Sequence, residues 1–356
     1  MFLLIFAALG ILTYGVRTRL SGNKHVATGM GGIVMALGIF TLFALTELPF
    51  YTPVLGEIVA LEVLVLWLFI AWGILKTTIR QRGRQLVDSM PKRFLIGTWV
   101  AGTAVLATLM VQVLPELWWL IDSLSAIALC LYLGYIVIVV YEYLHLLTTI
   151  RRQRATGVVL LATVATESIV IMLQSVIGSQ SFAMIARGLM IADTVILLIG
   201  LVLIVVHYRR LALERLENTW VDADCIIHGA VSITGLAIVR THGFSIVVAE
   251  GMWGIAAVLF VVVELLEVLR MIERVHADGW REGLFRYNVA QWTRNFTFGM
   301  FYAFSLALSR VLPSGGLLRG VADYGQYVVL LFLLVEVCLF CARYVTVHRH
   351  EVVAAK

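Results

Sequence analysis

The chain has 356 residues, of which 61% are hydrophobic and only 14% are charged, and its formal net charge is +5. A soluble domain carries about 25% charged residues, so this composition excludes an ordinary soluble protein. Apolar runs recur along the whole chain, and a run of about 20 residues can cross a hydrocarbon core as a helix. We therefore expect an all-α protein that is surrounded by membrane lipid.

Ten strong membrane spans are predicted, at 29–48, 55–76, 94–114, 119–144, 156–177, 185–207, 223–242, 246–270, 290–311 and 323–345. An eleventh apolar stretch, 2–16, has no basic residue before it and no small-x-small cleavage site after it. An extra short helix is therefore favoured over a cleaved signal peptide, and an incorrectly chosen start site is a further alternative. The expected organisation is an N-terminal helix and cytoplasmic linker (1–26), a ten-helix domain (27–348) and a short cytoplasmic tail (349–356).

The basic residues predict the orientation of these spans. Of the 27 lysines and arginines, 23 lie in one set of connections and at the C-terminus, and the other set holds only Arg187, Arg240, Arg310 and Arg319. Positively charged connections stay in the cytoplasm. The ten spans therefore begin and end inside, and the C-terminus is cytoplasmic. Because the positive charge follows the membrane topology, we expect no nucleic-acid partner.

A repeat is visible in the types of helix. Glycine, alanine, serine and threonine are about twice as frequent in the first, third, fifth, seventh and ninth spans as in the even spans. Small residues allow close approach or leave a cavity, and branched aliphatic residues suit a lipid-facing surface. The pattern predicts five helical hairpins in a ring, with odd helices inside and even helices outside. Tight helix–helix contacts without a pore are the simpler alternative.

The predicted inner helices combine glycines with hydroxyls. Such groups replace part of the hydration shell of an anion without a fixed charge, which suits weak binding during passage. The candidate pore-lining residues are Gly32, Thr98, Gly102, Thr103, Thr166, Ser232, Gly235, Thr297 and Gly299. For any single serine or threonine, a hydrogen bond to its own helix is the alternative.

Phe298 is the sharpest single position among these helices. It lies beside Gly299, midway along the ninth span, with Phe296, Phe301 and Phe304 nearby. A ring that projects into a narrow pore blocks it sterically and by dewetting. Phe298 is therefore a candidate gate, and simple packing against a neighbouring helix is the alternative.

Glu167 is the least expected residue of an anion pathway, because it stands near the middle of the fifth span. A carboxylate is costly there and is often functional. An ionised Glu167 that faced the pore would repel anions, so we expect it to be protonated or paired with a donor such as His228. Our hypothesis is that Glu167 and His228 form a proton or selectivity site, and a static hydrogen-bonded role is the alternative.

The sequence gives no indication of an enzyme. The histidines in the spans show no metal-ligand spacing and no paired arrangement for haem, and no G-x-x-x-x-G-K-[ST] loop is present. The four cysteines fall inside or at the ends of apolar runs, where packing is the simplest role. We expect no catalytic residue, no metal and no cofactor.

Several local strings resemble one known family. Pro91–Phe94 leads into Gly97-Thr-Trp-Val100, and the fifth span contains Leu160-Leu-Ala-Thr-Val-Ala-Thr-Glu-Ser168. The seventh contains His228-Gly-Ala-Val-Ser-Ile-Thr-Gly235, and the ninth contains Phe296-Thr-Phe-Gly-Met-Phe-Tyr302. Together with the hairpin order, these strings resemble the tellurite-resistance/dicarboxylate transporter family over about residues 27–348. That family includes plant guard-cell slow-type anion channels, a bacterial tellurite-resistance protein and fungal malate and sulfite carriers.

The resemblance implies a quasi-fivefold ring of hairpins, with a pore through each protomer of a homotrimer and Phe298 as the gate. It implies an anion channel of the bacterial inner membrane with small inorganic or organic anions as cargo. A proton-coupled carrier of C4-dicarboxylates or of oxyanions such as tellurite and sulfite, using Glu167, is the first alternative. A sensory or scaffold protein that conducts nothing is the second.

Overall fold

The computed structural model of the chain describes residues 2–21, 27–149, 155–211, 219–285, 287–312 and 315–354. Within these residues all regular structure is helical, which confirms the expected all-α class. The described part contains nine helical segments that are long and apolar enough to cross a membrane. They are Thr28–Glu47, Pro53–Arg80, Met90–Val113, Trp118–Thr149, Gly157–Ile177, Phe182–Arg210, Asp222–Thr241, Ile246–Arg281 and Gly316–Arg343.

These nine segments match nine of the ten strong spans that the sequence predicts. The remaining one, 290–311, forms helix α12 (Gln291–Val311). At about 1.5 Å per residue its 21 residues are long enough to cross a membrane. Its composition, however, is not apolar enough for it to be counted among the nine candidate segments. The reason is that α12 carries polar and aromatic residues that other helices surround, so it does not need a lipid-like surface.

The helices fall into a buried set and an exposed set. The buried set comprises α2 (Gly31–Ile39), α5 (Gly97–Val113), α7 (Leu161–Ile177), α10 (Ile226–Thr241) and α12. In the spans that contain the first four, 78% to 100% of the residues are buried, and α12 is buried along most of its length. These are the odd spans, which the sequence predicts to lie inside.

The exposed set comprises α3 (Pro53–Thr77), α6 (Trp118–Thr149), α8 (Ser179–Arg210), α11 (Ile246–Leu284) and α13 (Gly316–Ala354). Only 17% to 39% of the residues in their spans are buried. Large aliphatic side chains such as Leu133, Val202 and Leu331 are exposed on them, as expected of surfaces that meet lipid tails. The alternation of small-residue and aliphatic helices is therefore an alternation of burial.

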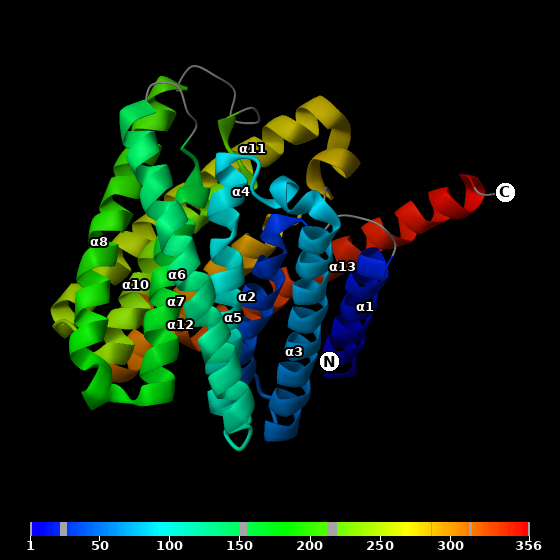
Figure 1. Ribbon diagram of the computed structural model, residues 1–356. Coiled ribbons are helices and arrows are strands. Elements are labelled where there is room, and N and C mark those ends of the chain that lie inside the picture. The colour runs from blue at the N-terminus through cyan, green and yellow to red at the C-terminus, as the bar shows by residue number, and fades with distance from the viewer. Residues whose placement is uncertain are drawn as a thin grey trace.

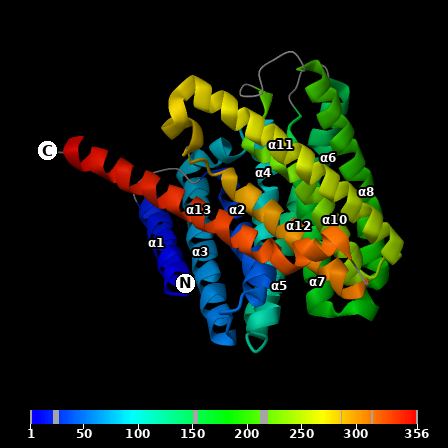
Figure 2. The ribbon, with the colours of Figure 1, turned by 180° about the vertical axis from the view of Figure 1, so that it is seen from behind.

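The buried helices contact one another in a closed circuit. α2 packs against α5, α5 against α7, α7 against α10, α10 against α12, and α12 against α2 again. Each outer helix packs against the inner helix next to it along the chain, as α6 does on α5 and α8 on α7 (Figure 1). On the opposite side of the molecule, α11 packs mainly against α10, and α13 packs against α12 (Figure 2).

The two ends of the chain lie on the same side of the molecule. The predicted extra N-terminal helix is present as α1 (Phe2–Ser21), which packs against α3 and α13 (Figure 1). Most of the predicted linker after it lies outside the described residues. α13 continues as a helix to Ala354, through most of the residues predicted as the tail (349–356).

Candidate functional site

All five inner helices contribute to one cavity of about 210 Å³, which we call the Arg240 cavity. Its lining residues are Ile39, Leu42, Phe43, Val105, Thr108, Val111, Gln112, Ser168, Ile171, Ser175, Ile233, Leu236, Arg240 and Met300. Among the described residues that line it, Arg240 is the one that carries a charge. The cavity thus combines apolar walls with a few hydroxyls, an amide and one cation.

A local change of helix type shapes this cavity. After Ile39, α2 continues as a π-helix over Phe40–Ala44, and π segments are often found at functional sites. Leu42 and Phe43, which line the cavity, lie on this segment. The guanidinium carbon of Arg240 lies 5.2 Å from the centre of the Phe43 ring, so a cation–π contact fixes the charge beside the cavity.

A second cavity, of about 640 Å³, lies at the opposite ends of α2 and α12; we call it the Thr293 cavity. Its lining includes Ala27, Thr28, Gly29, Thr77, Gln85, Leu86, Asp88, Lys92, Leu95, Asn288, Val289, Ala290 and Thr293. The Lys92 amino group donates to the Asp88 carboxylate at 2.9 Å and holds the pKa of that carboxyl below its ordinary value. The two charges offset each other, so this wall of the cavity is nearly neutral.

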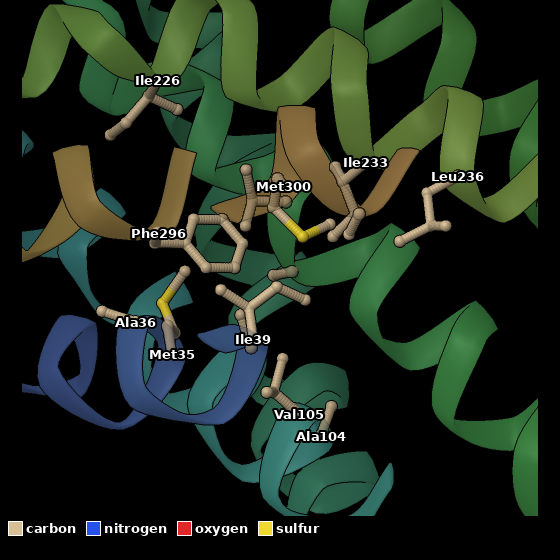
Figure 3. Close-up of a cluster of buried hydrophobic side chains, with 14 of the residues drawn as sticks. Met35, Ala36, Ile39, Ala104, Val105, Ile226, Ile233, Leu236, Phe296 and Met300 are labelled. Carbon is tan, nitrogen blue, oxygen red and sulfur yellow. The ribbon is translucent and has the colours of Figure 1, made fainter. Parts of the chain in front are cut away.

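An apolar layer separates the two cavities. Along α12, Thr293 lines one cavity and Met300 lines the other, and Phe296 lies between them on the same face, three residues from one and four from the other. Along α2, Met35 has the same intermediate position. Figure 3 shows the Phe296 ring among Met35, Ile39 and Met300. All four side chains are buried in the main hydrophobic cluster, so in this conformation the layer is closed.

Phe298 has a different environment from the one that the sequence predicts for a gate. Its ring centre lies 4.8 Å from that of Phe260 on α11 and 4.5 Å from that of Phe332 on α13. Both partners belong to the outer set of helices. The reason is geometric, because two residues along an α-helix turn the side chain by about 200°. Phe296 therefore faces the inner helices and Phe298 faces the opposite way.

The predicted pore-lining glycines lie at helix–helix contacts. A methyl group at Gly299 would come within 2.5 Å of Ile39 on α2, and one at Gly235 would overlap the Phe304 ring on α12. One at Gly102 would meet the Gly31 carbonyl at 3.1 Å, and one at Gly32 would meet Thr293 at 3.5 Å. At Gly102, Gly235 and Gly299 the lack of a side chain lets the inner helices approach each other, which is the simpler of the two interpretations of the sequence, whereas a methyl group at Gly32 would make ordinary contact.

The predicted hydroxyl lining shows a similar pattern. Each of the five predicted hydroxyls donates a hydrogen bond to the backbone carbonyl three or four residues earlier in the sequence; they are Thr98, Thr103, Thr166, Ser232 and Thr297. Thr103 also accepts a 2.9 Å hydrogen bond from the Trp67 indole on α3. None of the five is among the residues that line the two cavities. The hydroxyl side chains in the wall of the Arg240 cavity are Thr108, Ser168 and Ser175, and those in the wall of the Thr293 cavity are Thr28, Thr77 and Thr293.

Glu167 and His228 do not pair with each other. The Glu167 carboxyl interacts with Asp193 on α8, and both side chains are completely buried. His228 lies 3.7 Å from Glu264 on α11, and its ring is 6.2 Å from that of Phe298. Both groups therefore sit at junctions between an inner and an outer helix, and neither lines the Arg240 cavity.

A larger ionic cluster lies at another such junction. The Glu267 carboxylate on α11 has the guanidinium groups of Arg270, Arg274 and Arg294 within 3.1 to 3.5 Å. Arg270 also donates to Asp222 at 2.6 Å, and the Asn288 amide donates to the same carboxylate. The cluster ties α11 to the beginnings of α10 and α12. Its three guanidinium groups face two carboxylates, and because these ion pairs join three helical segments we assign the cluster a structural role.

Two residues of this site were not found from the sequence. Arg240 was counted only as a basic residue on the less basic side of the membrane, and Phe296 only as a neighbour of Phe298. The helical spacing of the sequence could have placed both Arg240 and Phe296 on a cavity-lining helix face. Thr293, Phe296 and Met300 follow the spacing of three and four residues that marks one helix face, and Arg240 follows Ile233 and Leu236 at the same spacing.

One comparison with known proteins identifies a family for this chain. A family model described as voltage-dependent anion channel matches residues 25–342, which is most of the chain. A search among curated proteins finds no match. The matched range covers the inner circuit, the outer helices and both cavities. The chain belongs to the voltage-dependent anion channel family.

Proposed function

We propose that small anions cross the membrane along the axis of the five inner helices, through one central pore in each protomer. In this proposal the circuit of helices is a quasi-fivefold ring of hairpins, and the two cavities are the ends of one pathway. The observation that carries the proposal is the Arg240 cavity, since α2, α5, α7, α10 and α12 all contribute to its wall. A cavity that all five inner helices share must lie on the axis of their circuit.

Phe296 is our proposed gate. Its ring fills the layer between the cavities together with Met35 and Met300 (Figure 3), and an apolar constriction of this kind closes a pore by dewetting. A rotation of the ring, or a small shift of α12 against α2, would open the layer. Phe298 is retained as the alternative gate on the basis of the family resemblance, and movement of its ring away from α11 and α13 would be required.

Arg240 is our proposed selectivity residue. A single guanidinium at the edge of an otherwise apolar cavity attracts anions and repels cations. The nearby hydroxyls of Thr108, Ser168 and Ser175 can replace part of the hydration shell of an anion without holding it tightly. Conduction needs this combination, because an ion must be bound well enough to enter and weakly enough to leave.

The family resemblance also supports a proposal for the oligomeric state of the protein and for the membrane that contains it. We infer a homotrimer in the bacterial cytoplasmic membrane with a cytoplasmic C-terminus. The basic residues support this orientation, since the Thr293 cavity would open to the side that holds most of them. The aliphatic surfaces of the outer helices are available to lipid or to neighbouring copies.

A proton-coupled carrier is the second candidate function, and one observation favours it. The buried carboxyls of Glu167 and Asp193 form an acidic pair inside the membrane region, and such pairs occur in proton relays. The cargo would then be a C4-dicarboxylate or an oxyanion such as tellurite or sulfite. The channel is preferred because Ser168, not Glu167, turns toward the Arg240 cavity.

Flux through the protein in liposomes tests the proposal. We expect chloride or nitrate current that follows the membrane potential and needs no proton gradient. Flux that appears only with a proton gradient would support the carrier instead. An absence of flux both in the wild type and in Phe296→Ala, with normal folding, would contradict both and favour a scaffold.

A further inference from the structure

Two acidic side chains meet at the junction of α7 and α8, away from the proposed pathway. Glu167 on α7 and Asp193 on α8 are both 0% exposed, and each lies well inside its candidate membrane span. The two carboxyls interact with each other. We call them the carboxyl pair.

The carboxyl pair lacks the partners that buried carboxylates normally have. None of its four oxygens makes a hydrogen bond of ordinary geometry among the described residues, and no basic side chain there forms an ion pair with either group. The Thr163 hydroxyl, one helix turn before Glu167, is also completely buried and without a hydrogen-bond partner, and it acts on Asp193. A buried hydroxyl beside two buried carboxyls, all without hydrogen-bond partners among the described residues, is rare in folded proteins and calls for a physical explanation.

The groups that face the pair from other helices are neutral. Among the described residues, the titratable side chains on α6 that feel the charge of Asp193 are Tyr132 and Tyr143. The Tyr132 hydroxyl donates to Thr166 at 3.3 Å, and the Tyr143 hydroxyl donates to the Val159 carbonyl at 3.0 Å. The protons of these two hydroxyls are therefore not donated to the carboxyl pair. Two adjacent negative charges would have no compensation at this depth, which is costly in a low-dielectric interior.

We propose that Glu167 and Asp193 form a proton-binding site in which the two carboxyls share at least one proton at neutral pH. A proton between them removes one of the two charges and supplies a donor to the other carboxylate, as in other carboxyl pairs that cannot both ionise. A proton also needs no space, which fits two groups that are fully buried. Neither carboxyl lines the Arg240 cavity, and the site goes beyond the proposed transport function because it exists whether or not anions flow.

Infrared spectroscopy of the purified, lipid-reconstituted protein tests the site, because a protonated carboxyl has a carbonyl stretching band that a carboxylate lacks. The variants are Glu167→Gln and Asp193→Asn, which keep the shape of each side chain. Glu47→Gln is the matched control, since Glu47 is paired with Arg310 at 2.6 Å. If a single substitution prevents folding, the double variant Glu167→Gln/Asp193→Asn makes the same comparison with two neutral amides.

At neutral pH we expect the protonated-carboxyl band of the wild type to be reduced in both Glu167→Gln and Asp193→Asn and unchanged in Glu47→Gln. Loss of carboxylate bands alone in the two pair variants would show that both groups are ionised and would overturn the proposal.

Discussion

The axis of the inner helices and the junctions between inner and outer helices differ in their chemistry. Along the axis, Phe296, Met35 and Met300 form an apolar layer, and Arg240 is the charge at its edge. At the junctions lie the carboxyl pair, the His228–Glu264 contact and the cluster around Glu267. The charges named here lie mostly at helix junctions, whereas we propose that the pathway along the axis is controlled by shape and dewetting.

This difference changes how a polar residue in a span should be interpreted. A glutamate in the fifth span suggests a pore residue, but Glu167 turns toward α8 while Ser168, the next residue, turns toward the Arg240 cavity. The next residue along a helix is rotated by about 100°, so neighbouring residues can belong to different environments. Position on the helix face therefore matters more than depth in the span.

The largest expected effect is on stability, at the Glu267 cluster. Glu267→Ala leaves the buried guanidinium of Arg294 without its 3.1 Å partner, and breaking a buried ion pair costs about 3–5 kcal/mol. We expect a large loss of thermal stability, with anion selectivity kept in the folded fraction. The control is Glu47→Ala, whose exposed partner Arg310 predicts a loss of about 1 kcal/mol or less. Equal losses in the two variants would contradict the assigned structural role.

A smaller loss is expected where two inner helices touch. In Gly235→Ala the new methyl group overlaps the Phe304 ring, and overpacking of this kind costs about 1–3 kcal/mol. Gly134→Ala on α6 is the control, because nothing lies within 4 Å of its new methyl group. Removing that helical glycine should be neutral or stabilise by about 0.5–1 kcal/mol. Thermal unfolding in detergent measures both, and no difference between them would argue against close packing of α10 on α12.

The effect of Arg240 should appear in transport and not in folding. In Arg240→Ala we expect anion flux to fall about fivefold, which corresponds to about 1 kcal/mol, and anion-over-cation selectivity to weaken. Arg310→Ala removes a neighbouring guanidinium that is already neutralised by Glu47 and should change flux much less. Measured reversal potentials in a salt gradient distinguish the two, and an equal change in both would show that only the general surface charge matters.

The smallest effect is expected from the carboxyl pair on transport at neutral pH. Because neither member of the pair lines the Arg240 cavity, Glu167→Gln/Asp193→Asn should keep anion flux within about twofold of the wild type, or about 0.4 kcal/mol. The carrier alternative makes the opposite prediction, since coupling would be lost with its proton site. Flux measured with and without a proton gradient separates these two outcomes.

Much of the architecture could be predicted because it depends on composition. The apolar runs predicted nine of the candidate spans, and the frequency of small residues identified α2, α5, α7, α10 and α12 as the inner helices. The ninth predicted span is a helix, but its apolar character comes from aromatic rings that other helices cover. The extent of α13 beyond the last predicted span could not be predicted from apolarity, because a helix can continue into a polar segment.

The candidate site could be predicted only in part. Which side chains line the cavities depends on how each helix is rotated about its own axis. The glycines and threonines of the inner helices were assigned to a pore, but Gly235 and Gly299 face neighbouring helices and Thr98 and Ser232 bond to their own chain. The pairing of Glu167 with Asp193 joins two helices whose rotation about their axes is set by packing. Composition does not determine that rotation.

The proposed gate is tested most directly by single-channel recording of Phe296→Ala beside Phe298→Ala. If the apolar layer between the two cavities closes the pore, Phe296→Ala should raise anion conductance at least about tenfold, which corresponds to about 1.4 kcal/mol. Phe298→Ala, which removes a ring packed against α11 and α13, should leave the conductance near that of the wild type. A rise in Phe298→Ala with no rise in Phe296→Ala, at normal expression, would contradict the account and make Phe298 the gate.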